Sequence, residues 1–218
     1  MRRMVLAAAL AAAMGEASAG ELRGEARLAG PVPELPPLEA TKDRAVCGGE
    51  VPDDSLVAAG GKLKNVVVVV KGGPRPPPAK IALDQERCRY LPHVQGAALG
   101  STLEVVNGDA LLHNVHGYVG QATAFNLAMA AKNQRTPRKL EKLGLVVVRC
   151  DVHSWMSAFV LVTDSPFAVS GADGAFRVEG LPPGRYTVTA WHERFGERSA
   201  SVTVPAAGAA QVDFTFGR

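Results

Sequence analysis

The sequence predicts an all-β protein. Val-rich runs recur at short spacing, and the turn-forming residues Gly and Pro are plentiful, with 23 and 15 copies. Several segments alternate apolar and polar residues, as half-buried strands do. Phe125 to Ala131 is the only stretch with helical character, and it is short. These observations favour strands joined by tight turns.

The first nineteen residues have the pattern of a signal peptide. Arg2 and Arg3 give a positive start, Met4 to Gly15 form an apolar core too short to span a bilayer, and Ala17-Ser18-Ala19 fits the cleavage pattern. This signal peptide would direct export and be cleaved after Ala19. We expect the mature chain in the periplasm, without a membrane span. The formal net charge of +3 would then fall to +2, which is too small to suggest a nucleic-acid partner.

The middle of the chain reads as a set of strands. Val66 to Val70 is a continuous β-branched run, as expected for a strand buried on both faces. Thr102 to Val106 and Leu145 to Arg149 are further strands. Lys132 to Lys142 carries five basic residues and one acid. This segment is a solvated loop or, alternatively, a docking patch for an acidic redox partner.

The pattern changes after Asp164. Apolar residues alternate with polar neighbours there, which predicts a meander of four or five half-buried strands. The alternating apolar residues are Phe176 and Val178; Tyr186, Val188 and Ala190; Val202 and Val204; Val212, Phe214 and Phe216. A sandwich this small buries little core, so the strand near Leu22–Leu28 is a candidate to complete it. We therefore divide the mature chain into an N-terminal β segment (20–62), a central domain (63–163) and a C-terminal domain (164–218).

The chain has three cysteines. An exported chain tends to pair its thiols, and an odd number leaves one over. Cys47 and Cys88 lie outside the segments that contain the candidate metal ligands described below, and they are candidates for a disulfide. Cys150 is then left as a thiol, which is either a buried free cysteine or a metal ligand.

The neighbours of Cys150 favour the metal. The segment Cys150-Asp151-Val152-His153-Ser154-Trp155-Met156 puts a thiolate, an imidazole and a thioether into one loop between two strands. The segment Asn107 to His116 can bring a second imidazole from a distant strand. This donor set favours copper, with zinc as a possible substitute. Two histidines, one cysteine and one weak methionine are the ligand set of an electron-transfer copper site.

The remaining histidines have less specific surroundings. His116 lies three residues after His113, so on an extended strand the two rings point to opposite faces. We interpret His116 as exposed or facing a partner, His93 as structural or exposed, and His192 as a packing or interdomain residue, with metal binding as the less favoured alternative for each. Trp155 and Phe159 are expected either to keep water away from the sulfur or to pack in the core.

Two family resemblances follow from these motifs. Leu103-Glu104-Val105-Val106-Asn107-Gly108-Asp109 with His113-Asn114-Val115, and Cys150-x-x-His153, resemble the ligand segments of plastocyanin-like cupredoxins. Asp173-Gly174-x-Phe176 and Leu181-Pro182-Pro183-Gly184-x-Tyr186-x-Val188 resemble the carboxypeptidase regulatory-like, transthyretin-like domain. The combination resembles exported bacterial proteins that sometimes carry a methylamine-utilisation label.

The resemblance implies a cupredoxin Greek-key β-sandwich joined to a small prealbumin-like β-sandwich. It implies His113, Cys150 and His153 as the equatorial ligands of one copper ion and Met156 as the candidate axial ligand. It also implies Asn114 as the residue whose side chain ties the two ligand loops together. One departure concerns Met156: plastocyanin-like loops have more residues between the histidine and the methionine. His-x-x-Met resembles the copper-A loop instead, but that binuclear site needs two loop cysteines, so we expect a mononuclear site.

We expect a one-electron carrier that exchanges electrons with c-type cytochromes or a dehydrogenase. The sequence has no phosphate loop, nucleophile elbow or second histidine cluster, so we do not expect an enzyme. One alternative is a copper carrier or sensor without redox turnover. Another is a glycan- or protein-binding β-sandwich with a structural metal.

Overall fold

The computed structural model describes residues 20–217. The predicted signal peptide, residues 1–19, lies outside the described residues. The predicted fold class is confirmed, because the described part of the chain contains 21 strands and a single helix, α1 (Arg44–Cys47), of four residues. Within residues 20–217 no helix is long and apolar enough to cross a lipid bilayer.

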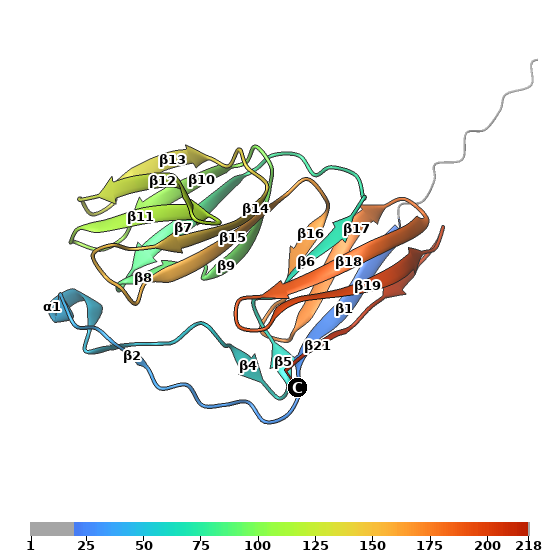
Figure 1. The fold of residues 1–218 in the computed structure, drawn as a ribbon, viewed down its shortest axis with the longest axis horizontal. Helices are drawn as coiled ribbons and strands as arrows, with labels where there is room; N and C mark the ends of the chain where they lie inside the picture. Colours follow the sequence, from blue (N-terminus) through green and yellow to red (C-terminus); the bar gives the residue numbers. More distant parts are fainter. Residues whose placement is uncertain (1–19, 218) are drawn as a thin grey trace, which may run out of the picture.

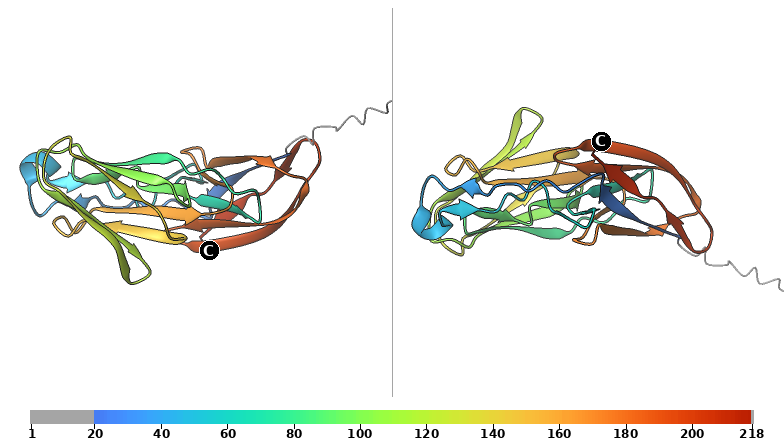
Figure 2. Two further views of the ribbon diagram at one scale, coloured as in Figure 1. Left: turned by 90° about the horizontal axis from the view of Figure 1, so that it is seen from above. Right: turned by 90° about the horizontal axis from the view of Figure 1, so that it is seen from below.

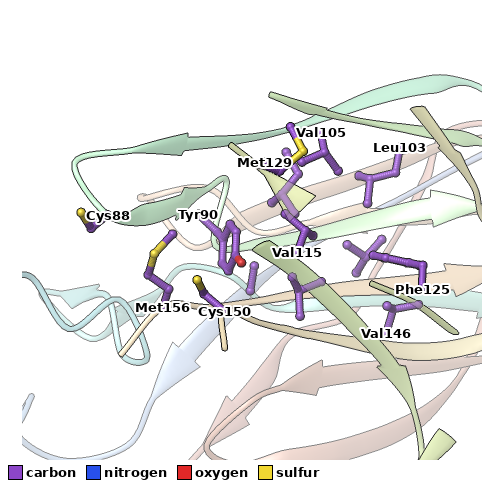
Figure 3. Packing of buried hydrophobic residues seen from close by; sticks show 14 of the residues in the cluster. Cys88, Tyr90, Leu103, Val105, Val115, Phe125, Met129, Val146, Cys150 and Met156 are labelled. Atoms are coloured by element: carbon purple, nitrogen blue, oxygen red, sulfur yellow. The ribbon is translucent and has the colours of Figure 1, made fainter. Parts of the chain in front are cut away.

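The central part of the chain forms a sandwich of two sheets, which Figure 1 shows in green to yellow. One sheet has the order β13 (Arg135–Lys139), β10 (Thr102–Asn107), β7 (Lys80–Glu86) and β8 (Arg89–Leu91). The other has the order β12 (Ala122–Met129), β11 (His113–Val119), β14 (Gly144–Arg149), β15 (Ser157–Thr163) and β9 (Val94–Ala98). A common apolar core fills the space between them, with Leu103, Val105, Val115 and Met129 fully buried (Figure 3).

A second sandwich contains the end of the chain together with its beginning. One sheet has the order β16 (Phe167–Val169), β6 (Val67–Lys71), β18 (Gly184–His192) and β19 (Gly196–Val204). The other is built on β1 (Gly20–Leu28), which pairs with β17 (Ala175–Leu181), β5 (Lys62–Leu63), β20 (Ala209–Gln211) and β21 (Phe214–Phe216), while β4 (Ala58–Ala59) pairs with β5. The N-terminal strand thus lies within the second sandwich, as our hypothesis for Leu22–Leu28 requires.

The predicted boundary at residue 63 differs from the structure. β6 pairs with β16 and β18, so the Val66–Val70 run belongs to the second sandwich and not to the central domain. The run is buried on both faces, as predicted: Val68 and Val70 face the core of the second sandwich, and Val67 and Val69 face the central sandwich. A strand buried on both faces carries no pattern that tells which sandwich it joins.

Two local expectations are wrong. Residues Phe125 to Ala131 are not helical, because most of them lie in β12, which pairs with β11 along its length. Phe125, Leu127 and Met129 alternate as a strand requires. The basic segment is not simply a loop either, because β13 pairs with β10 at the edge of its sheet. An edge strand needs fewer backbone donors, so it tolerates Pro137. The basic side chains discourage pairing of this edge with another strand.

A third region closes one end of the central sandwich. We call residues 38–51 the cap segment; it contains β2 (Leu38–Glu39), α1 and β3 (Glu50–Val51), and β2 pairs with β3. Figure 1 shows it beyond the ends of β8 and β11, away from the second sandwich. Figure 2 shows the two sandwiches end to end, with the β11–β12 hairpin projecting from the central one.

Candidate metal centre

The predicted ligands come together at the capped end of the central sandwich. His113 is the first residue of β11, and Cys150 and His153 lie in the loop between β14 and β15. β11 and β14 are neighbours, with His116 opposite Arg149, so the pairing brings His113 next to the cysteine loop. His113 and His153 have no exposed surface, and Cys150 is 4% exposed.

Three donor atoms converge there. The Nδ1 atoms of His113 and His153 are 3.0 Å apart, and Cys150 Sγ lies 3.7 Å from His153 Nδ1. One donor atom from each of the three residues falls within 4.8 Å of the others. Two imidazoles and a thiol at this spacing, in a site closed to water, fit a soft or borderline transition metal ion.

Met156 adjoins the same site. Its side chain is 1% exposed and belongs to the same apolar core as Cys150 and Tyr90. Figure 3 draws Met156 beside Cys150, with Tyr90 next to both. A one-turn bend places it there, because the Met156 backbone N–H donates to His153 O at 3.0 Å. Its role as an axial ligand stays a prediction.

Each imidazole turns its other nitrogen toward a carboxylate. His113 Nε2 lies 2.8 Å from Asp109 Oδ2, and His153 Nε2 lies 2.9 Å from Asp43 Oδ2 in the cap segment. Carboxylates in this position fix the tautomer and orientation of a metal-binding imidazole and leave Nδ1 for the metal. Our sequence reasoning missed both aspartates as parts of the site.

Asn114 ties the two ligand segments together, as the resemblance implies. Its Oδ1 accepts from the Asp151 backbone N–H at 2.6 Å, and its Nδ2 donates to Asp151 Oδ2 at 2.8 Å and to Asn126 Oδ1 at 2.9 Å. The strand that carries His113 is therefore bound to the residue that follows Cys150.

Burial affects the protonation of two groups at the site. It lowers the pKa of His113 below its ordinary value, although the hydrogen bond to Asp109 opposes this shift. Burial, and after it the nearby Cys150, raises the pKa of the Tyr90 hydroxyl well above its ordinary value. Tyr90 thus remains a neutral donor beside the sulfur, and its hydroxyl reaches the backbone oxygens of Asn114 and Arg149.

The aromatic residues near the loop have different positions. The Trp155 ring lies 5.0 Å from the His153 ring, and its Nε1–H donates to Cys88 O at 3.2 Å. Trp155 therefore covers His153. Phe159 instead packs between the two sandwiches, 5.5 Å from the Trp191 ring, so it belongs to the interdomain core.

The cysteines divide as the sequence suggests. Cys47 and Cys88 form a disulfide, and Cys150 is a free, buried thiol. The disulfide lies close to the candidate metal site, since Cys47, Cys88 and His153 also each place a donor atom within 4.8 Å of the others.

The other three histidines lie outside this centre. His116 bonds Asp151 and Thr123 on the outside of the sheet, and its ring stacks on Tyr118. His93 joins the two sandwiches, because its ring contacts Ser157 O and Glu193. His192 packs against Phe195 and Phe216 in the second sandwich.

Comparison with known proteins gives a family match for the end of the chain. Residues 157–217 match the family model of the carboxypeptidase regulatory-like domain. The C-terminal part of the chain is therefore similar to the carboxypeptidase regulatory-like domain. The match begins at β15, a strand that pairs with β14 and β9 in the central sandwich. The search of curated proteins gives no match.

Solved structures that align with part of the chain include cupredoxins and a copper-containing enzyme. A variant of amicyanin in its reduced Cu(I) form is 22% identical and covers 44% of this chain and 98% of its own, with a TM-score of 0.35. A purple cupredoxin from Nitrosopumilus maritimus is 20% identical and covers 39% of this chain and 99% of its own, with a TM-score of 0.32. A copper-containing nitrite reductase from Thermus scotoductus SA-01 is 21% identical and covers 52% of this chain and 27% of its own, with a TM-score of 0.34. These identities and TM-scores are too low to assign a metal, so the candidate metal centre is supported by the geometry of its donor atoms.

Proposed function

We propose that the protein is an exported carrier of single electrons with one copper ion held by His113, Cys150 and His153. The supporting observation is the convergence of two Nδ1 atoms and one free thiol in a closed site. Met156 is the axial ligand in this proposal, and zinc is the competing ion. The partners are c-type cytochromes or a dehydrogenase in the periplasm, and the chain has no catalytic activity of its own.

The residues around the site suit a one-electron change of a bound ion with little structural rearrangement. A bound copper ion would supply the couple between Cu(I) and Cu(II). Thiolate and thioether donors suit the reduced ion, and imidazoles suit both states. Asp109, Asp43 and Asn114 hold the imidazoles and the loop in place, while Trp155 and the cap segment exclude water. A donor set fixed in this way needs little rearrangement when the charge changes.

The visible spectrum of the protein loaded with Cu(II) tests the ligand set. We expect an intense thiolate band that Cys150→Ser abolishes and that His113→Ala and His153→Ala abolish or displace. His116→Ala is the matched control, because this histidine lies on β11 but faces away from the site. A band that survives Cys150→Ser would contradict the proposal.

One observation favours a copper carrier or sensor as the second candidate. Both imidazoles are fully buried, and the outer nitrogen of His153 faces Asp43 rather than open solvent. A redox titration separates the two functions. A reversible one-electron couple with rapid oxidation by a c-type cytochrome supports the electron carrier. A protein that binds Cu(I) tightly but does not cycle supports the carrier of copper.

A further inference from the structure

The cap segment contributes a carboxylate to the metal centre from far away in the sequence. Asp43 lies at the start of α1, and its Oδ2 is 2.9 Å from His153 Nε2. The two residues are 110 positions apart in the chain. The bond therefore lasts only while the cap segment stays in place.

The cap segment has few apolar anchors of its own. Residues 41–46 are exposed, and only Ala40, Cys47 and Val51 are buried against the central core. Asp43 also adopts a left-handed backbone conformation, with φ of 49°. Aspartate is one of the few non-glycine residues that adopt this conformation readily, so it suits the residue before the turn of α1.

The disulfide supplies the missing anchor. Cys47 closes the single turn that begins at Asp43, because its backbone N–H donates to Asp43 O at 3.0 Å. Its bonded partner Cys88 lies in the turn between β7 and β8, which belongs to the central sandwich. The covalent bond thus joins the turn that carries Asp43 to the body of the domain.

Cys88, the other residue of the disulfide, is hydrogen-bonded to Asp109, the second carboxylate of the site. Asp109 accepts from the backbone N–H groups of Arg87 and Cys88 at 2.8 and 2.9 Å, and it contacts His113 Nε2. Asp109 is 5% exposed and lies in the β10–β11 connection, so the sandwich holds it without the cap. The two imidazoles therefore depend on the disulfide to different degrees, His153 more than His113.

We propose that Asp43 is a positioning residue for the metal centre and that the Cys47–Cys88 disulfide acts on the centre by clamping Asp43 against His153. This inference rests on the proposed metal centre. Mutation of a hydrogen-bond partner of a metal-binding histidine typically lowers the metal affinity by about 10- to 100-fold. Because the disulfide acts through Asp43, losing both should cost no more than losing either one.

The test measures Cu(I) affinity by competition with a chromophoric chelator for the full mature chain. The variants are Asp43→Ala, the pair Cys47→Ala and Cys88→Ala, and the combination of all three. Glu50→Ala is the matched control, because it removes an exposed carboxylate from the same segment. We expect the first two variants to bind about 10- to 100-fold more weakly, the triple variant to match them, and the control to bind like the wild type.

Two results would overturn the inference. One is an unchanged affinity in Asp43→Ala, which keeps the disulfide and so tests the proposal even if the cysteine-free chain does not fold. The other is an additive loss in the triple variant, which would show that the disulfide acts by another route.

A second readout separates this inference from the proposed function. Nitrogen NMR of the metal-free protein reports which nitrogen of His153 carries its proton. We expect Asp43→Ala to move His153 away from the Nε2–H form while His113 stays unchanged. If the wild type binds no copper, the proposed function fails, and an unchanged His153 signal in Asp43→Ala would refute the positioning role as well.

Discussion

The two sandwiches have similar architecture but differ in where they bury polar groups. The core of the central sandwich ends in a cluster of buried polar side chains, with His113, His153, Asp109, Asn107 and Asn114 at one end. The core of the second sandwich is apolar except at isolated positions such as His192 and Ser170. Buried polar groups are costly unless they are paired, so a cluster of them at one end of a core points to a site that binds something.

From this difference we predict that the second sandwich has a structural role and that substitutions in its core leave the metal centre unchanged. Phe216 in β21 has no exposed surface and packs against His192 and Phe195. We expect Phe216→Ala to lower the free energy of unfolding of this sandwich by about 3–5 kcal/mol. Calorimetry measures that loss, and the thiolate band of the copper-loaded protein should not change. A changed band would show that the two sandwiches are not independent.

The single buried histidine of the second sandwich should make its stability depend on pH. Burial, with smaller contributions from His93 and Arg194, lowers the pKa of His192 to about 4 in the folded protein. The unfolded chain takes up this proton near its ordinary pKa of about 6.5. The free energy of unfolding should therefore fall by about 3 kcal/mol as the pH drops from about 6.5 to about 4.

His192→Gln checks this pH dependence because glutamine does not titrate. Chemical denaturation at several pH values should show a smaller loss between pH 6.5 and pH 4 in the variant. Equal losses in the two proteins would assign the pH dependence to groups other than His192.

The central sandwich should respond to the loss of a single buried hydroxyl. The Tyr90 hydroxyl donates to the backbone oxygen of Asn114 and lies 3.2 Å from that of Arg149, and these two residues lie on the strands that lead to the ligands. We expect Tyr90→Phe to cost about 1–3 kcal/mol, because it removes a buried hydrogen bond. The thiolate band should also shift, since the hydroxyl lies beside Cys150. Unfolding and visible spectra measured on one sample check both effects, and no change in either would contradict this role.

The smallest effect is expected on the surface. Arg177 makes ion pairs with Glu21 and Glu179, but its side chain is 61% exposed. Arg177→Ala should change the free energy of unfolding by less than about 1 kcal/mol, because water screens the pairs. A larger loss in chemical denaturation would show that this pairing of β1 with β17 depends on charge.

The sequence predicts the parts of the site that lie close together along the chain. Cys150 and His153 share one loop, and the turn before His113 marks a second candidate ligand segment, so their residue types alone predict a metal site. Asp109 carries a weak signal, because it lies four residues before His113 in a turn. Asp43 carries none, because only the folding of the cap segment and its disulfide brings it to His153.

The fold shows the same division between local and distant information. Alternation correctly indicates the strands after Asp164, and the β-branched run correctly indicates a strand buried on both faces. The pairing partners of β6 and β13 depend on distant segments, so a single sequence gives no pattern that assigns them.

X-ray absorption at the copper edge tests the central claim most directly. The spectrum reports which atoms surround the ion in the loaded protein, and Cys150→Ser provides the matched comparison. We expect two nitrogen neighbours and one short sulfur neighbour in the wild type, with the sulfur absent from the variant. A wild-type spectrum without a sulfur neighbour, or one that Cys150→Ser leaves unchanged, would contradict a copper centre built on His113, Cys150 and His153.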